Sequence, residues 1–167
     1  MWDTKSRFTV LVEVLSPDLY RYAYWLVGDQ HVAEDLVQET FTRAWRSLDS
    51  LREEGAAKAW LITTLRRENA RRFSHKSLER IDIDVDTLEA SNAQEDQLEA
   101  RALRRALTEL SRDYRDPLLL QVVGGFSVGE IAQEMNLSTG AVTTRLFRAR
   151  QKLRDVLTHH PDIEVSK

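Results

Sequence analysis

The sequence predicts an all-α protein made of two small helical domains joined by a flexible acidic linker, with a helix-turn-helix in the C-terminal domain. Apolar residues recur at helical spacing along most of the 167 residues. Only 6 Gly and 3 Pro are present, which leaves few loops. The helical pattern fails in one segment, which separates the two domains. We therefore expect a first domain at 1–76, a linker at 77–97, a second domain at 98–158 and a tail at 159–167.

The first domain is predicted to begin with two helices that meet at Ser16 and Pro17. Serine suits a helix cap and proline suits the first helical position, so a helix break is expected in front of Pro17. The second of these helices runs to about Val27 and ends at Gly28, a residue typical of helix ends. The apolar residues of the helix before the break are Phe8, Val12 and Leu15.

Two further helices are predicted in this domain, from about Val32 to Ser47 and from about Ala56 past Arg72. Each carries an apolar stripe at helical spacing, which would face the core. The residues expected to face inward are Leu36, Val37, Phe41, Ala44, Trp45 and Leu48 in the former helix, and Ala57, Leu61, Thr64 and Leu65 in the latter.

The linker is recognised by its charge. Eight acidic residues and one basic residue lie between Glu79 and Glu99. The Ile-Asp alternation within it resembles a strand, but the sequence offers no partner strand and the segment is too charged to be buried. We therefore interpret it as disordered or extended.

Helical periodicity resumes at Leu98 and continues to Leu157. Pro117 would cost an internal hydrogen bond, so the helix that contains it is expected either to be kinked or to start late. Gly124 and Gly125 are expected to end that helix. The apolar residues of these helices are Leu103, Ala106, Leu107, Leu110, Tyr114, Leu118, Leu119 and Val122.

A helix-turn-helix is predicted from Ser127 to Leu153. Ser127 and Glu130 have the spacing of a capping box, in which each side chain satisfies an orphan amide of the helix start. Asn136 and Leu137 make a short turn, and Ser138 caps the second helix. This spacing is typical of DNA-binding helix-turn-helix units.

The second helix of this motif has an apolar face and a polar, basic face. Arg145 and Arg150 flank the apolar stripe and could contact phosphates, and an exposed Phe147 could contact a thymine methyl group. The alternative is an ordinary helical hairpin with a solvated basic face. The residues expected to face the core are Val142, Leu146, Ala149 and Leu153. Those expected to face DNA are Thr143, Thr144, Arg145, Phe147, Arg148 and Gln151.

A polar strip is predicted on the helix that follows Gly28. Asp35, Gln38, Glu39 and Thr42 recur at i, i+3, i+4 and i+7, which places them on one face. Taken alone, such a strip is most simply a solvated helix face.

The surrounding string AEDLVQETFTRAW resembles the core-polymerase-binding helix of sigma-70-family factors of the extracytoplasmic-function (ECF) group. LYRYAYWLVGD, AKAWLITTLRRENARRF and the segment from Leu110 to Leu157 are similar to the family's preceding helix, −10 helix and −35-reading domain. The resemblance implies that the polar strip docks on clamp helices of bacterial core RNA polymerase. Departures at Arg67, Arg71 and Thr143 from residues common in the family leave the preferred promoter sequence open.

The resemblance also assigns the helix from Ala57 to promoter DNA at the −10 element, with the loop of residues 48–56 capturing an unstacked base. The alternative is a solvated helix end with arginines suited to the helix dipole. Trp60 could stack on a base or anchor the core. The −10-binding residues expected on this helix are Trp60, Thr63, Arg66, Arg67 and Arg71.

The expected function is therefore promoter recognition and melting with polymerase, regulated by a separate anti-sigma factor. Two alternatives remain, namely a stand-alone helix-turn-helix regulator and a sigma-like decoy that binds an anti-sigma factor. No catalytic, cofactor or metal site is expected: the chain has no Cys, and His159, His160 and Asp162 lie in a polar tail. We see neither a signal peptide nor an apolar run long enough for a membrane span, and expect a soluble cytoplasmic protein.

Overall fold

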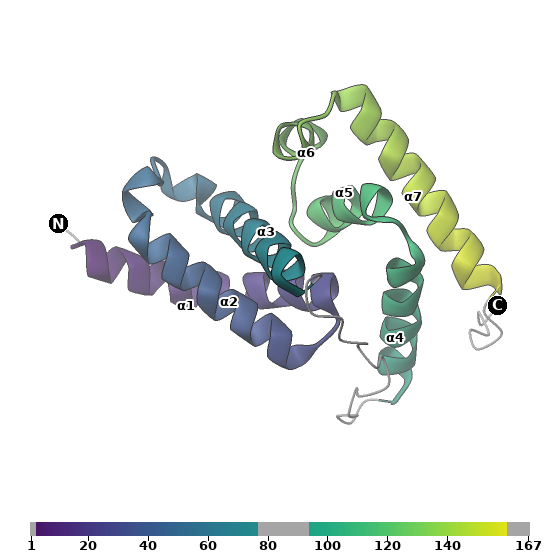
Figure 1. The fold of residues 1–167 in the computed structure, drawn as a ribbon, viewed down its shortest axis with the longest axis horizontal. Coiled ribbons are helices and arrows are strands. Elements are labelled where there is room, and N and C mark those ends of the chain that lie inside the picture. The colour runs from purple at the N-terminus through teal and green to yellow at the C-terminus, as the bar shows by residue number, and fades with distance from the viewer. Residues whose placement is uncertain (1–2, 77–93, 160–167) are drawn as a thin grey trace. The chain divides into compact units, whose positions relative to one another are not determined.

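The computed structural model describes residues 3–76 and 94–159, which belong to two compact units (Figure 1). The first unit contains three helices and two short 3-10 turns, and the second contains four helices. No strand occurs among the described residues, so the predicted all-α fold is confirmed. The first unit consists of α1 (Thr4–Val27), α2 (Gln30–Arg46), η1 (Leu48–Ser50), η2 (Glu54–Ala56) and α3 (Ala57–Lys76). The second consists of α4 (Gln94–Glu109), α5 (Arg112–Val122), α6 (Val128–Met135) and α7 (Thr139–His159).

Most of the predicted linker lies outside the described residues. Residues 94–97, which were assigned to the linker, belong to α4 instead.

The predicted helix break at Ser16–Pro17 is wrong, because α1 is continuous and contains Pro17. A proline inside a helix removes one backbone hydrogen bond, but the burial of Leu19, Tyr22 and Ala23 after it holds the helix together. The helix ends as expected at Gly28, whose φ of 73° suits glycine and whose N–H donates to the Tyr24 carbonyl at 2.8 Å.

The core of the first unit lies where α1, α2 and α3 pack against one another. Most of the predicted inward residues of α2 and α3 are buried, but Leu48 and Thr64 are only half-buried and Trp45 is 46% exposed. Its ring lies at the surface with an edge contact to Phe8, at 5.0 Å between centroids. The buried residues of α2 and α3 include Ala33, Leu36, Val37, Thr40, Phe41, Ala44, Ala57, Leu61, Ile62 and Leu65.

In the second unit, α7 packs against α4, α5 and α6, and α5 also packs against α6, so the core lies between α7 and these helices. Helix α5 begins at Arg112 and carries Pro117 in its buried interior, so it does not start late. Val122, one of the apolar residues from which this helix was predicted, is 69% exposed. The other buried residues are Ala106, Leu107, Leu110, Leu118, Leu119, Leu120, Phe126, Ile131, Ala132, Val142, Leu146 and Ala149.

Gly124 provides the first stability prediction. A Cβ atom at this position would lie 2.7 Å from the Leu120 carbonyl oxygen, which is backbone and cannot move cheaply. We expect Gly124→Ala to lower the free energy of unfolding by about 1–3 kcal/mol, as measured by urea titration. Gly129→Ala is the control: it lies in α6 with only the Ser127 Oγ nearby, at 3.9 Å, and should stabilise the protein by up to about 1 kcal/mol. Equal effects of the two substitutions would contradict this account of Gly124.

Candidate polymerase and nucleic-acid interfaces

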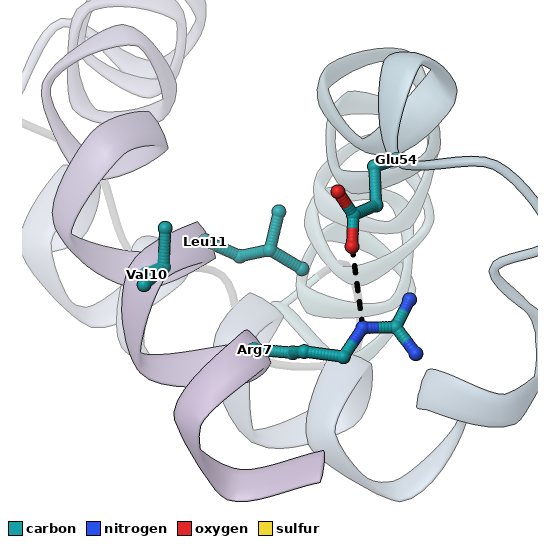
Figure 2. Close-up of a pocket in the computed structure, with 4 residues that line it drawn as sticks. All are labelled: Arg7, Val10, Leu11 and Glu54. Carbon is teal, nitrogen blue, oxygen red and sulfur yellow. Dashed lines mark hydrogen bonds and ion pairs between the residues drawn. The ribbon is translucent and has the colours of Figure 1, made fainter. Parts of the chain in front are cut away.

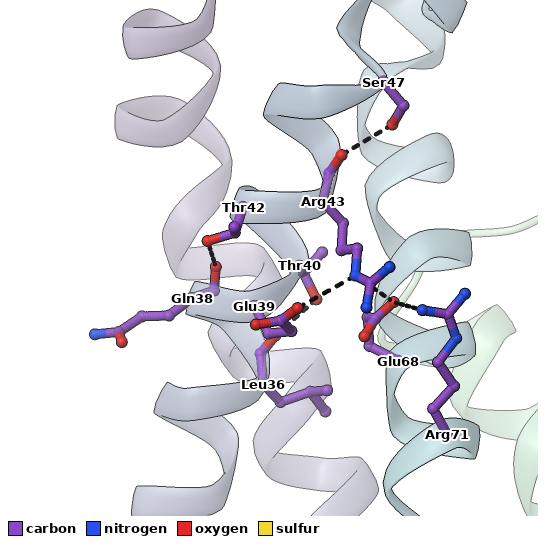
Figure 3. Close-up of polar contacts among 9 residues, drawn as sticks. All are labelled: Leu36, Gln38, Glu39, Thr40, Thr42, Arg43, Ser47, Glu68 and Arg71. Carbon is purple, nitrogen blue, oxygen red and sulfur yellow. Dashed lines mark hydrogen bonds and ion pairs between the residues drawn. The ribbon is translucent and has the colours of Figure 1, made fainter.

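The polar strip of α2 lies opposite the buried face of the helix. Asp35, Gln38 and Thr42 are exposed and Glu39 is half-buried. The Thr42 hydroxyl donates to the Gln38 carbonyl at 3.0 Å, and Arg43 Nε donates to Glu39 Oε1 at 3.2 Å (Figure 3). The strip therefore carries two carboxylates and two neutral polar groups on the outer face of α2.

Next to this strip lies an ion-pair network that the sequence patterns did not indicate. Glu68 on α3 is only 7% exposed, and its Oε1 lies 3.3 Å from Arg43 Nε and 3.4 Å from Arg71 Nη1 (Figure 3). A buried carboxylate needs compensating cations, and these two arginines supply them. Arg43 thus connects Glu39 on the strip with Glu68 on α3.

The proposed −10 residues on α3 differ in exposure. Arg67 and Arg71 are exposed, whereas Trp60, Thr63 and Arg66 are half-buried. Arg71 also pairs with Glu68, so its guanidinium is oriented by the fold. The partial burial of Trp60 is compatible with either of its two predicted roles.

A hollow of about 430 Å³ also lies in the first unit (Figure 2). It is lined by Val10 and Leu11 of α1 and by the ion pair of Arg7 with Glu54, whose Nε and Oε1 atoms are 3.3 Å apart. Glu54 belongs to the loop of residues 48–56, which the resemblance assigns to capture of an unstacked base; the individually predicted polymerase- and DNA-binding residues are not among these lining residues.

The helix-turn-helix in the second unit has the predicted caps. Ser127 N–H donates to Glu130 Oε2 at 2.7 Å and Glu130 N–H donates to Ser127 Oγ at 3.2 Å, which is the reciprocal capping box. Asn136 ends α6 with a φ of 54°, and the Ser138 hydroxyl accepts from the Ala141 amide at 3.1 Å. Local hydrogen bonds therefore set where α7 begins.

The contribution of the capping box to the stability of the protein is expected to depend on pH. The Ser127 backbone amide, and after it the hydroxyl, hold the pKa of Glu130 below its ordinary value of 4.5. A lowered folded-state pKa adds stability above the unfolded value, and this stability is lost as the pH falls through the folded value. We expect Glu130→Gln to lower the melting temperature at neutral pH, with the difference from wild type shrinking below pH 4.5. A difference that stays constant down to acid unfolding would contradict this.

Helix α7 buries one side and exposes the other, as predicted. Val142, Leu146 and Ala149 are buried, while Phe147 is 62% exposed. Of the other residues predicted to face DNA, Arg145 is half-buried. The exposed ones are Thr143, Thr144, Arg148 and Gln151.

The arginines that flank the apolar stripe are tied to α5. Arg145 Nη1 donates to Asp113 Oδ1 at 3.2 Å, and Arg150 Nη2 donates to the Gln121 side-chain oxygen. Lys152 Nζ lies 5.5 Å from the centre of the Tyr114 ring. These contacts join α7 to α5 beside the buried stripe, which places Phe147 and Arg148 on the outer face of α7.

Comparison with known proteins tests the resemblance. The family model of sigma-70 region 2 matches residues 11–78, and that of sigma-70 region 4 matches residues 100–153. The chain is 36% identical over 146 residues to the ECF RNA polymerase sigma factor EcfG of Rhodopseudomonas palustris, with 84% of this chain and 80% of EcfG covered. It is 31% identical to the sigma factor SigV of Bacillus subtilis, with 93% of each covered. The chain belongs to the ECF RNA polymerase sigma factors.

Other ECF sigma factors and solved structures agree with this family. The ECF sigma factor SigE of Mycolicibacterium smegmatis is 35% identical over 90% of this chain, which spans 61% of SigE. The sigma factor RpoE of Bartonella quintana, solved with the anti-sigma factor NepR, superposes with a TM-score of 0.79 at 30% identity, covering 92% of this chain and 98% of RpoE. CnrH, solved with the cytosolic domain of CnrY, superposes with a TM-score of 0.68 at 25% identity, covering 93% of this chain and 90% of CnrH.

The part of the chain that the structure describes contains neither a membrane-spanning helix nor a metal-binding cluster. No described helix is long and apolar enough to cross a membrane. Within residues 3–76 and 94–159, no cluster of three or more His, Asp or Glu residues could hold a metal ion. His160 and Asp162 of the tail lie outside these residues.

Proposed function

We propose that this ECF sigma factor binds bacterial core RNA polymerase through the strip of Asp35, Gln38, Glu39 and Thr42. Its α3 then meets the −10 element and the exposed face of α7 reads the −35 element. The observation that carries the proposal is the presence of both sigma modules in order, each with its predicted binding residues at the surface or half-buried. Acids on the strip suit basic side chains of a partner, with apolar neighbours such as Trp45 adding contact area.

The chain would promote melting without catalysing any chemical step, as a cytoplasmic protein with no metal or cofactor. Binding free energy can offset the unstacking of promoter bases, which costs a few kcal/mol for each base. The loop of residues 48–56 and the start of α3 would hold such a base. Polymerase would perform the nucleotide chemistry.

A separate anti-sigma factor would regulate the chain. RpoE of Bartonella quintana was solved in complex with such a factor. We expect a corresponding partner for this sigma factor, which would compete with polymerase.

The two other candidate functions explain less. A stand-alone helix-turn-helix regulator accounts for α6 and α7 but gives no role to the strip on α2. A decoy for an anti-sigma factor would not need the exposed Phe147 and Arg148 on α7.

The test is reconstitution of transcription with bacterial core polymerase on a library of promoters, with transcript start sites mapped. We expect start sites downstream of a shared pair of −35 and −10 elements. The free chain should bind the selected promoter weakly in a gel-shift assay, because without polymerase its two DNA-binding modules are not held in register. A chain that ignores core polymerase, or that binds promoter DNA tightly by itself, would contradict the proposal.

A further inference from the structure

The carboxylate of Glu68 and the guanidinium of Arg43 are each shared between two partners. Arg43 Nε carries a single hydrogen, yet it lies 3.2 Å from Glu39 Oε1 and 3.3 Å from Glu68 Oε1. Glu68 Oε1 in turn lies 3.4 Å from Arg71 Nη1 (Figure 3). Glu39, Arg43, Glu68 and Arg71 therefore form a continuous series of ion pairs, from the polar strip of α2 to the proposed −10 surface of α3.

Glu68 is the most buried side chain in this series of ion pairs. The Glu68 side chain is 9% exposed, whereas those of Glu39, Arg43 and Arg71 are 42%, 40% and 57% exposed. Water can solvate the outer groups but cannot replace the cations beside Glu68. While Arg43 also pairs with Glu39, the charge of Glu68 is compensated partly by Arg71. This ion pair holds the Arg71 guanidinium close to α3.

We infer that Glu68 is a positioning residue that couples docking of polymerase at Glu39 to DNA contact by Arg71. The inference rests on the proposed function and extends it. A basic polymerase side chain that pairs with Glu39 leaves Arg43 entirely to Glu68. Arg71 is then released to contact a promoter phosphate. By linkage, promoter DNA that holds Arg71 strengthens docking at Glu39 by the same factor.

The test is suppression of one substitution by another, measured as promoter affinity of preassembled holoenzyme at saturating core polymerase. The probe is a promoter selected in the reconstitution above. In Arg43→Gln, Arg71 becomes the one described residue that is paired with Glu68, and it stays held there. We expect promoter affinity to fall about three- to fivefold, the range of an exposed ion pair. Adding Glu68→Gln removes the anion that holds Arg71, so the double variant should return to within about twofold of wild type.

Glu34→Gln is the matched control, because Glu34 is an exposed α2 carboxylate whose side-chain hydrogen bond is to Gln30. Arg43→Gln combined with Glu34→Gln should stay as weak as Arg43→Gln alone. In an Arg71→Gln background, Arg43→Gln should not change promoter affinity further. The inference is overturned if the Arg43→Gln, Glu68→Gln variant binds promoter as weakly as Arg43→Gln, or more weakly, since a purely structural Glu68 would give that result. Failure of the proposed function looks different, because wild-type chain would then form no holoenzyme.

Discussion

Replacing both Asp35 and Glu39 with lysine is expected to lower the affinity for bacterial core RNA polymerase about 100-fold. In the proposed complex these two carboxylates meet basic groups of polymerase, and lysines there would add like-charge repulsion, which costs several kcal/mol at an interface. Both side chains lie on the outer face of α2, away from its buried stripe, so the fold should survive. Affinity can be measured by fluorescence anisotropy of labelled chain titrated with core polymerase.

The control for this variant carries the same change of net charge outside the strip. Glu13 on α1 and Glu34 on α2 are both exposed, and their replacement by lysine should leave core affinity within about threefold of wild type. Both double variants should keep the circular dichroism spectrum of the wild type. If the strip variant binds core polymerase as tightly as this control, the docking assignment is wrong.

Replacing Arg148 with alanine is expected to reduce transcription from −35-dependent promoters about 10- to 100-fold. Arg148 is exposed on the outer face of α7, next to Phe147, and a good base contact contributes about 1–3 kcal/mol of discrimination. The measurement is run-off transcription at holoenzyme concentrations below saturation, on paired templates that contain or lack the −35 element. Phe147→Ala should act in the same direction, and removing this exposed apolar side chain should not destabilise the protein.

Arg105→Ala is the matched loss of one positive charge in the second unit. Arg105 is exposed on α4, outside the helix-turn-helix, so this variant should transcribe both templates like wild type. An equal loss by Arg148→Ala on both templates would show that the substitution acts through folding or assembly instead of −35 recognition.

Local signals made most of the helices predictable. Gly28 and the capping box of Ser127 with Glu130 act over a few residues, and periodicity identified the buried stripes of α2 and α7. The failures arise where tertiary packing overrides a local preference. Pro17 would start a helix by propensity alone, but Leu19 and Tyr22 bury enough surface to keep α1 in one piece.

The candidate interfaces were predictable as helix faces but not as networks. A face follows from spacing, so Asp35, Gln38 and Thr42 were correctly expected at the surface. The Glu68 contact with Arg43 joins residues on different helices, and nothing in the sequence pattern pairs them. Glu68 sits within an arginine-rich run, where spacing gave no sign that it is buried while its neighbour Arg67 is exposed.

The placement of Trp45 and the other tryptophans in the first unit has a practical consequence. All four tryptophans, at positions 2, 25, 45 and 60, precede the second unit, which has one tyrosine, Tyr114. Indole emission from the intact chain therefore comes from the first unit alone, while far-ultraviolet ellipticity sums over both units. In one sample, without any attached dye, the two signals can show whether the units denature together or one after the other.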